Sequence, residues 1–426
     1  MAKDQSSIRK VAVIGGVRLP FCRAGTNYSE VSNLELLVAS LSALVERYQL
    51  KGKKVDEVAL GTVFFHPSTW NMAREAVLQS GLSPESPGLG IQRACATSLD
   101  AAIDVANKIA LGKIEVAIAG GTESISNVSV FYQQRLARRI MTTAQAKDWK
   151  TRMGAWKGIK LAELKPASPA TVEYTTKKSM GQHCELMAQQ WEITREDEDE
   201  LSLKSHQNGI MGYETGFYQD LVVPFQGVKR DNNLRADTSL DKLAKLKPVF
   251  DRSNRGTLTA GNSSPLTDGA GCVLLASEAW AKANGQEVLA YLSDYQSAAV
   301  DIQKEGLLMA PAYAVPPLLE RNGLKLQDFD FYEVHEAFAA QVLCTLKAWE
   351  SDEFCRRAGQ KQALGVIDRS KLNVRGGSVA LGHPFGATGA RLISTAAKLL
   401  KEKGTGRSLL SICTGGGMGT AAILER

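Results

Sequence analysis

Strand-like and helix-like hydrophobic patterns alternate along the N-terminal part of the chain. Apolar runs at 10–14, 55–63 and 114–119 have the short, continuous character of buried strands, and the last is expected to end at Gly120–Gly121. Between the second and third runs, apolar residues recur at helical spacing over 99–110. This strand–helix–strand order predicts an α/β layered fold.

The middle of the chain, about residues 124–259, differs in character. It combines a basic stretch with an acidic run at 196–200, as expected for charged helices and loops laid over a core. After Gly269 the strand–helix rhythm returns and persists to the C-terminus. The apolar run into paired glycines at 116–122 is echoed at 410–416, which a duplicated α/β unit would leave behind.

Composition indicates a soluble globular protein with a large core. The chain has 426 residues, 44% hydrophobic and 23% charged, which is room for two or three domains. The early strand leaves no room for a signal or transit peptide, and no apolar run reaches the roughly 18 residues of a membrane span. The seven cysteines are widely spaced without a C-x-x-C pair, so reduced thiols are expected instead of a disulfide framework or a zinc site.

Positive charge is concentrated in one stretch. The net charge of +6 is modest and does not call for nucleic acid. Residues 135–178, however, hold eleven Lys or Arg against three acidic residues. A solvated helix face, a polyanionic ligand, an acidic partner subunit and a membrane surface all remain open as explanations.

Cys95 is the first candidate for a reactive side chain. It comes directly before the helical pattern that begins at Leu99, among small residues that would let a bulky substrate approach. A helix N-terminus favours a thiolate, and cysteines in such settings have pKa values of roughly 3.5–7.5 instead of about 8.5. From these residues alone, an activated nucleophile and a buried structural cysteine both remain open.

Two glycine-rich segments near the C-terminus are the next candidates. Residues 376–389 place five glycines and a proline around His383, a shaped loop from which an imidazole can act as a base or an oxyanion donor. Residues 411–419 look like a phosphate loop, but the strand-like run 420–424 follows where a nucleotide site needs a helix. We therefore predict a hairpin whose free backbone N–H groups point into a site beside Cys413.

His335 and Glu336 lie where a strand-like run turns into a helix. Metal ligation explains them poorly, because a second histidine one helical turn further on is missing. Orientation of a water or a substrate oxygen is favoured.

Together these motifs resemble the thiolase family over essentially the whole chain. The patterns that carry the resemblance are C-x-G-G-G-M-G at 413–419 and G-x-x-x-A-L-G-H-P-x-G-A-T-G at 376–389, with Cys95 far upstream. In that family the cysteine matching Cys95 is the acylated nucleophile, and the histidine matching His383 takes up its proton. The cysteine matching Cys413 is a general acid and base.

The resemblance also implies how developing negative charge is stabilised. Backbone N–H groups of Cys95 and Gly415 would bind the tetrahedral intermediates, and His383 with a bound water would bind the enolate oxygen. The implied activity is thiolytic cleavage of 3-oxoacyl-CoA in fatty-acid β-oxidation (acetyl-CoA C-acyltransferase). Coenzyme A is then a substrate, and no permanently bound cofactor or metal is expected.

His335 departs from the commonest family pattern, which has asparagine at this position. The histidine form resembles the β subunits of fatty-acid-oxidation complexes, namely the mitochondrial trifunctional protein and its bacterial counterpart of the anaerobic type, and His335 is expected to hold the catalytic water. Residues 261–265 match that group too. By this resemblance Ser264 contacts pantetheine and Met180 lines the acyl pocket. The alternatives are a biosynthetic acetoacetyl-CoA thiolase, another condensing enzyme of the same fold, and an inactive thiolase-like carrier.

The implied fold is α/β, with two duplicated βα core domains in an αβαβα layered arrangement. The N-terminal domain is expected over 1–277, with an inserted loop domain over 124–259, and the C-terminal domain over 285–426. The resemblance further implies a homodimer joined to hydratase/dehydrogenase α subunits in an α2β2 complex. The basic stretch is expected to meet the α subunit, with peripheral membrane contact as the alternative. The missing transit peptide favours a cytoplasmic, bacterial protein.

Overall fold

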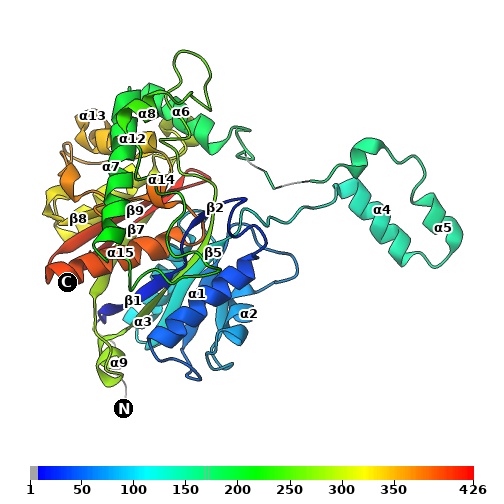
Figure 1. Cartoon of the computed structure of the whole chain (residues 1–426), viewed down its shortest axis with the longest axis horizontal. Helices are drawn as coiled ribbons and strands as arrows, with labels where there is room; N and C mark the ends of the chain where they lie inside the picture. The colour runs from blue at the N-terminus through cyan, green and yellow to red at the C-terminus, as the bar shows by residue number, and fades with distance from the viewer. Residues whose placement is uncertain (1–7, 168, 171) are drawn as a thin grey trace.

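One mixed ten-stranded sheet forms the centre of the molecule (Figure 1). The computed structural model describes residues 8–167, 169–170 and 172–426. The strands lie in the order β4-β3-β5-β6-β1-β7-β10-β9-β8, and β2 pairs with β6 beside this path. Their bounds are β1 Val11–Arg18, β2 Cys22–Arg23, β3 Glu57–Gly61, β4 Gly88–Gly90, β5 Val116–Glu123, β6 Thr267–Ser277, β7 Ala290–Ala299, β8 Phe331–Val334, β9 Arg407–Thr414 and β10 Met418–Glu425.

The two halves of the sheet repeat one topology. In the first half β5 pairs parallel with β3 and antiparallel with β6, which pairs with β1. In the second half β9 pairs parallel with β8 and antiparallel with β10, which pairs with β7. The echoed segments predicted from the sequence are thus the equivalent strands β5 and β9. The halves join through a short pairing of β1 with β7.

Helices α3 (Thr97–Ala110) and α15 (Thr388–Lys403) pack against each other as the central layer between the two halves. Strand residues alternate between layers: Val273 and Leu275 of β6 join the central core, whereas Leu274 faces the outer helices. The outer layers are α1 (Asn33–Arg47) and α2 (Met72–Gln79) on one half, and α11 (Ala310–Asn322) and α12 (Ala339–Glu350) on the other. The expected αβαβα arrangement is therefore confirmed.

Gly389 lets the two central helices touch where both begin. A Cβ atom at this position would lie 2.2 Å from the backbone nitrogen of Leu99 and 2.8 Å from its Cα, so a side chain here would force the helices apart. Because both helices start at one place, the segments just before them also meet there.

The prediction that the third apolar run ends at Gly120–Gly121 was wrong. Both glycines lie inside β5, paired with Cys272 and Gly271 of β6. A Cβ atom on Gly121 would lie 2.2 Å from the carbonyl oxygen of Gly386. The glycines therefore permit a close approach of the loop before α15 and do not end the strand.

The middle segment covers the C-terminal half and sends out an arm. Its helices are α6 (Met180–Gln190), α7 (Arg195–Glu214) and α8 (Leu240–Ala244), and the predicted acidic run forms the first turns of α7, where it complements the helix dipole. The division into domains at 1–277, 124–259 and 285–426 stays a prediction.

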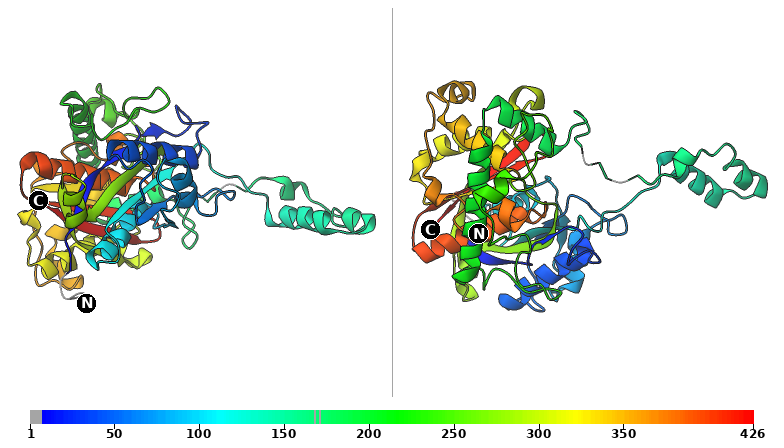
Figure 2. Two further views of the ribbon diagram at one scale, coloured as in Figure 1. Left: turned by 90° about the horizontal axis from the view of Figure 1, so that it is seen from below. Right: turned by 45° about the horizontal axis from the view of Figure 1, so that its top comes forward.

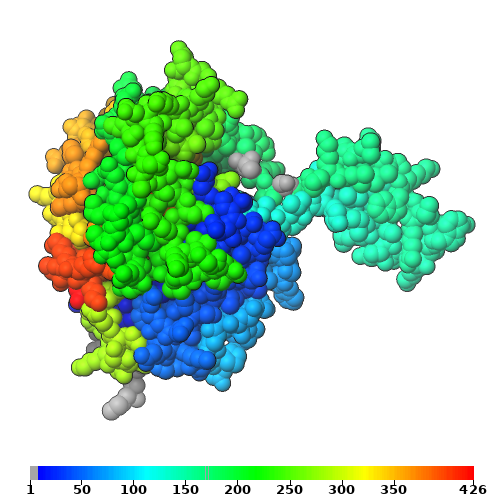
Figure 3. Space-filling model, viewed as in Figure 1, coloured from blue at the N-terminus to red at the C-terminus, as the bar shows by residue number. Residues whose placement is uncertain are grey.

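The arm (residues 131–167) stands away from the body in every view (Figures 1, 2 and 3). It contains α4 (Gln134–Gln145), α5 (Trp149–Gly154) and a 3-10 turn, η1 (Leu161–Leu164). Two backbone hydrogen bonds between Phe131 and Ala167, of 2.8 and 2.7 Å, close its base. Inside it, Arg139 donates to Glu163 and to carbonyl oxygens across the turn.

Short elements complete the chain. They are α9 Glu278–Ala283, α10 Ile302–Glu305, η2 Leu326–Asp328, α13 Asp352–Arg357, η3 Arg369–Lys371 and α14 Ser378–Leu381. Within the described residues, none of the helices is both long and apolar enough to cross a membrane.

Candidate active site

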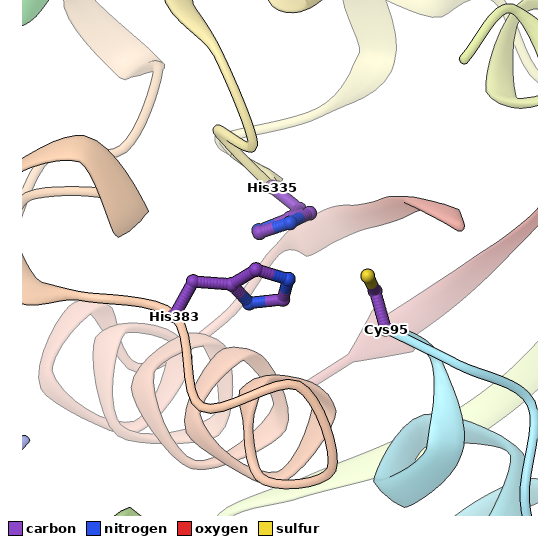
Figure 4. Close-up of side chains that lie close together, drawn as sticks. All are labelled: Cys95, His335 and His383. Atoms are coloured by element: carbon purple, nitrogen blue, oxygen red, sulfur yellow. The ribbon is translucent and has the colours of Figure 1, made fainter. Parts of the chain in front are cut away.

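Cys95, His335 and His383 converge from three parts of the chain (Figure 4). Cys95 lies just before α3, His335 directly after β8, and His383 in the loop between α14 and α15. The thiol sulfur and one nitrogen of each imidazole all lie within 4.8 Å of one another. The two imidazole ring centres are 4.0 Å apart. The fold therefore assembles a thiol and two imidazoles at the N-terminal end of the central helices.

A strained turn presents Cys95. Ala94 has a φ of 41°, which is uncommon for a residue with a side chain and is found at functional sites. The hydroxyl of Thr97 donates to the Ala94 carbonyl and accepts from the Arg93 N–H, which fixes the turn. No side chain caps α3 at Ala96, so the helix N-terminus is left open toward Cys95.

The expected low pKa of the Cys95 thiol is not found. Burial raises its pKa to about 12, and hydrogen bonds from the backbone of Gly415 and of Cys95 itself act in the opposite direction but do not outweigh it. The sequence-based expectation was wrong because it considered the helix terminus without the surrounding protein. A thiol with a raised pKa stays protonated and needs a base to become a nucleophile.

The hydrogen bonds around His383 leave its Nε2 nitrogen as an acceptor. Thr388 donates its hydroxyl proton to the Pro384 carbonyl at 3.0 Å, so it must accept at the 2.6 Å contact with Nδ1 of His383. His383 therefore carries its proton on Nδ1 and leaves the Nε2 lone pair free. Burial and the charge of Arg391 lower its pKa to about 3, so the imidazole is neutral at rest. This tautomer suits a base for the Cys95 thiol.

His335 is a second buried, neutral imidazole. Burial, His383 and Arg391 lower its pKa well below the usual value. Its Nδ1 lies 2.9 Å from the hydroxyl oxygen of Ser378, and its Nε2 is buried without a hydrogen-bond partner among the described residues. An unpaired buried nitrogen beside the thiol is a contact point for a substrate or water.

The predicted hairpin at 411–419 is confirmed, which also bears out the rejection of a nucleotide loop. Strands β9 and β10 pair directly around a three-glycine turn, with Met418 opposite Thr414 and Gly419 opposite Cys413. Cys413 is 1% exposed, and burial together with the neighbouring Cys95 raises its pKa well above the usual value. The second thiol is therefore next to the first and protonated.

Ser264 and Met180 lie beside the site. The backbone N–H of Ser264 donates to the Ala337 carbonyl, next to the segment that carries His335. The sulfur and terminal methyl of Met180 are 3.9 Å from where a Cβ on Gly415 would stand. Their roles as a pantetheine contact and an acyl-pocket residue stay predictions.

Two acidic residues at the site carry no recognisable sequence signal. Glu173 accepts from the Gly416 N–H at 3.0 Å and so places a carboxylate on the glycine turn. Glu123 accepts from the backbone of Val63, Phe64 and Gly386, and burial raises its pKa to about 7. Both are ordinary acidic residues in the sequence, and only the fold brings them to Cys95.

The thiol and the two imidazoles are also a donor set that could hold a soft metal ion. The sequence-based reasoning against metal ligation considered only ligands close together in the chain. His335 finds its second histidine 48 positions away in the chain, at His383. Local spacing could not reveal a cluster that the tertiary structure assembles.

A separate cavity lies away from Cys95 and the two imidazoles. This cavity of about 700 Å³ is lined by Ala106 and Ala110 near the other end of α3, together with Tyr291 and Arg407. Several of its charged groups are paired, as Arg407 is with Glu425, and Lys10 lies over the Tyr291 ring. It therefore contributes no candidate catalytic group.

Two family models match the chain: "Thiolase, N-terminal domain" over residues 11–279 and "Thiolase, C-terminal domain" over residues 286–426. The chain belongs to the thiolase family. The resemblance inferred from the motifs is confirmed, and so is the thiolase fold.

Individual thiolases match over nearly their whole length. The 3-ketoacyl-CoA thiolase of Photorhabdus laumondii is 41% identical over 423 residues, which are 98% of this chain and 97% of the relative. That of Yersinia enterocolitica is 40% identical with the same coverage. The solved acetyl-CoA acetyltransferase of Bacillus anthracis has a TM-score of 0.81 at 32% identity, over 98% of this chain and 99% of the other. A thiolase of Ascaris suum in complex with coenzyme A has a TM-score of 0.82 at 25% identity, over 98% and 100%.

Proposed function

We propose that this thiolase is a 3-ketoacyl-CoA thiolase (acetyl-CoA C-acyltransferase) of fatty-acid β-oxidation, which cleaves 3-oxoacyl-CoA with CoA to acetyl-CoA and a shortened acyl-CoA. The convergence of Cys95, His335 and His383 within 4.8 Å carries the proposal, because it joins a thiol to a base of the correct tautomer. Relatives at 40–41% identity that bear this name support the substrate class. The same proposal makes CoA a substrate. We further propose a bacterial, cytoplasmic enzyme, in line with the bacterial sources of these relatives.

In the first half of the reaction Cys95 becomes acylated. His383 Nε2 takes the thiol proton as the sulfur attacks the 3-keto carbon, and the carbonyl becomes a tetrahedral alkoxide. Collapse of the alkoxide breaks the bond between C2 and C3. The released acetyl-CoA enolate takes a proton from the Cys413 thiol. Because burial keeps Cys413 protonated, it is prepared to act first as an acid.

In the second half CoA removes the acyl group. The Cys413 thiolate takes the proton of the incoming CoA thiol, and the CoA sulfur attacks the acyl carbonyl on Cys95. The Cys95 sulfur leaves and recovers its proton from His383, so both cysteines return to their starting state. Each proton taken in one half is thus returned in the other.

Two groups of donors stabilise the negative charges. Backbone N–H groups of Gly415 and Cys95, which already lower the pKa of the Cys95 thiol, would bind the tetrahedral alkoxide. On the enolate side His383, protonated after the first step, and a water held by His335 would bind the thioester oxygen. Loss of one such donor commonly costs about 10²–10³-fold in rate.

The alternatives differ in what they need from the site. A condensing enzyme of fatty-acid or polyketide synthesis has no use for a second buried thiol beside the first, and Cys413 therefore argues against it. A biosynthetic acetoacetyl-CoA thiolase shares the chemistry and differs in chain length. An inactive carrier needs neither thiol.

Steady-state thiolysis of short-, medium- and long-chain 3-oxoacyl-CoA substrates tests the substrate class. We expect kcat/KM to rise beyond the four-carbon substrate, because an acyl tail gains apolar burial of about 0.8 kcal/mol per CH₂. A maximum at acetoacetyl-CoA would overturn the β-oxidation proposal and favour the biosynthetic alternative. Acceptance of acyl-carrier-protein substrates in place of CoA would favour the condensing enzyme.

We also propose that the arm is the docking surface for a hydratase/dehydrogenase α subunit, within an α2β2 complex built on a thiolase homodimer. The arm carries nine Lys or Arg against two acidic residues. It also exposes large apolar side chains, with Trp149 70% and Leu161 86% exposed, next to that charge. A protruding surface that is both basic and apolar suits an acidic partner with an apolar patch.

The two ends of the arm lie side by side, so the arm can be deleted without disturbing the body of the protein. Joining Phe131 to Ala167 through a short glycine turn should preserve the two backbone hydrogen bonds between them. We expect the deleted enzyme to keep its thiolysis rate and to remain a dimer, with a mass lowered only by the missing residues, and to stop co-eluting with the α subunit in light-scattering chromatography. Unchanged co-elution would contradict the proposal. Loss of binding to anionic lipid vesicles with the α subunit still bound would point to a membrane surface instead.

A further inference from the structure

A buried chain of polar contacts leads from Nδ1 of His335 to Arg391. A guanidinium nitrogen of Arg391 donates to the Ser378 hydroxyl oxygen at 3.1 Å, and that oxygen is 2.9 Å from Nδ1 of His335. All three side chains are at most 1% exposed. Glu333 approaches another nitrogen of Arg391 at 3.8 Å.

The chemistry of these groups fixes the direction of the hydrogen bonds. An arginine can only donate, so the Ser378 oxygen accepts from Arg391. The Ser378 hydroxyl also has one proton to donate, and among the described residues Nδ1 of His335 is the only acceptor with which it forms a hydrogen bond, so that proton is assigned to the bond with Nδ1. An imidazole that accepts at Nδ1 carries its proton on Nε2, the nitrogen that faces the site without a partner among the described residues.

We infer that Ser378 and Arg391 are positioning residues that hold His335 in the Nε2–H tautomer, opposite to the tautomer of His383. Thr388 makes His383 an acceptor at Nε2, and the Arg391–Ser378 pair makes His335 a donor there. Two neighbouring histidines, with rings tilted by 45° to each other, thereby present one lone pair and one proton to the same site.

The charge of Arg391 supports this arrangement in two ways. It faces both imidazoles and disfavours a second positive charge on either, which keeps His335 neutral. It also polarises the hydroxyl of Ser378, which makes that group a stronger donor to Nδ1. The titratable groups around His335 are His383 and Cys95 beside it, Arg391 and Glu333 beyond Ser378, and the buried Glu336, which is the next residue in the chain.

The catalytic meaning of this tautomer rests on the proposed thiolase function. The water that binds the enolate oxygen needs a hydrogen-bond donor to hold it. Many thiolases have an asparagine at this position, and its amide N–H is always a donor. A histidine at this position donates only in one of its two neutral tautomers. A partner that selects the tautomer is therefore required once histidine replaces asparagine, and Ser378 supplies it.

Kinetics of Ser378→Ala test the role of the hydroxyl. We expect kcat to fall by up to the roughly 10²–10³-fold that loss of an oxyanion donor costs, with KM little changed, because the donor acts on charge that develops during the reaction. In a His335→Asn enzyme the same Ser378→Ala change should cost little, since asparagine has no tautomer to select. An equal cost in both backgrounds would overturn the inference.

A matched control removes a buried serine hydroxyl that makes no hydrogen bond to the described residues. Ser408 in β9 is fully buried, and its hydroxyl has no hydrogen-bond partner among the described residues. Ser408→Ala should keep the full rate and near-native thermal stability. A rate loss in Ser378→Ala that is matched by Ser408→Ala would indicate a general packing defect and would contradict a specific role for Ser378.

Nitrogen-15 NMR of histidine-labelled enzyme reads the tautomers directly. The chain has five histidines, and His335→Asn and His383→Asn assign the two site signals. We expect the proton of His335 on Nε2, that of His383 on Nδ1, and a shift of His335 toward Nδ1–H in Ser378→Ala. A wild-type His335 protonated on Nδ1 would overturn the inference. The NMR measurement needs no substrate. It therefore tests the tautomer of His335 even if the wild-type enzyme proves inactive on every 3-oxoacyl-CoA.

Discussion

Cys95→Ser is expected to lower kcat/KM for thiolysis of 3-oxoacyl-CoA on the order of 10⁴–10⁶-fold, the loss seen when a covalent nucleophile is removed from a cooperating site. Burial already raises the pKa of the Cys95 thiol to about 12, and a hydroxyl in the same place holds its proton more tightly still. His383 therefore has a less acidic group to deprotonate, and an oxygen is a poorer nucleophile here than the sulfur that it replaces. Intact-protein mass after mixing with substrate should show an acyl adduct in the wild type and none in the variant.

The matched control for this substitution is Cys355→Ser. Cys355 is also buried with a pKa raised by burial, but it lies on α13 and donates weakly to carbonyl oxygens of α12. That variant should keep both the thiolysis rate and the mass adduct. Coenzyme-A-dependent cleavage that survives in Cys95→Ser at near the wild-type rate would sink the assignment of the nucleophile.

Cys413→Ala is expected to lower kcat by about 10²–10⁴-fold, the contribution of a well-placed general acid and base. Both halves of the reaction suffer, because the enolate loses its proton donor and CoA loses its base. The direct measurement is exchange of the C2 protons of acetyl-CoA with deuterium, which the wild-type enzyme should catalyse and the variant should not.

Alkylation separates the two cysteines. In the proposed mechanism the base for Cys95 is His383, which lies beside it, so Cys95 in the Cys413→Ala enzyme should still react with iodoacetamide at close to the wild-type rate. Loss of that reactivity would mean that Cys413 shapes the site and is not a separate acid and base. Retained deuterium exchange in the variant would assign the proton transfer to another group.

Much of the local structure follows from the sequence because it depends on neighbours in the chain. The glycines after Cys413, followed by an apolar strand-like run, define the hairpin of β9 and β10. Helical spacing after Leu99 defines α3, and the echo of 116–122 in 410–416 corresponds to equivalent strands of a duplicated sheet. Each of these patterns needs only the alternation of side chains or the freedom of glycine.

The chemical state of the site does not follow from local patterns. A helix N-terminus next to Cys95 predicted a low pKa, but the packing around the thiol removes water from it, and that desolvation outweighs the helix. Gly120 and Gly121 looked like the end of a strand, yet they are there so that the loop before α15 can approach β5. Both errors come from partners that are remote in the sequence.

The sequence by itself determined the family, the duplicated α/β architecture and the residues Cys95, His335, His383 and Cys413 as candidates. Only the tertiary structure decided that the thiol and the two imidazoles meet, that both thiols stay protonated, and that the two histidines are held as one acceptor and one donor. The physical reason is that proton positions and pKa values depend on burial and on single hydrogen bonds, such as those from Thr388 and Ser378, whose direction is fixed by contacts between segments far apart in the chain.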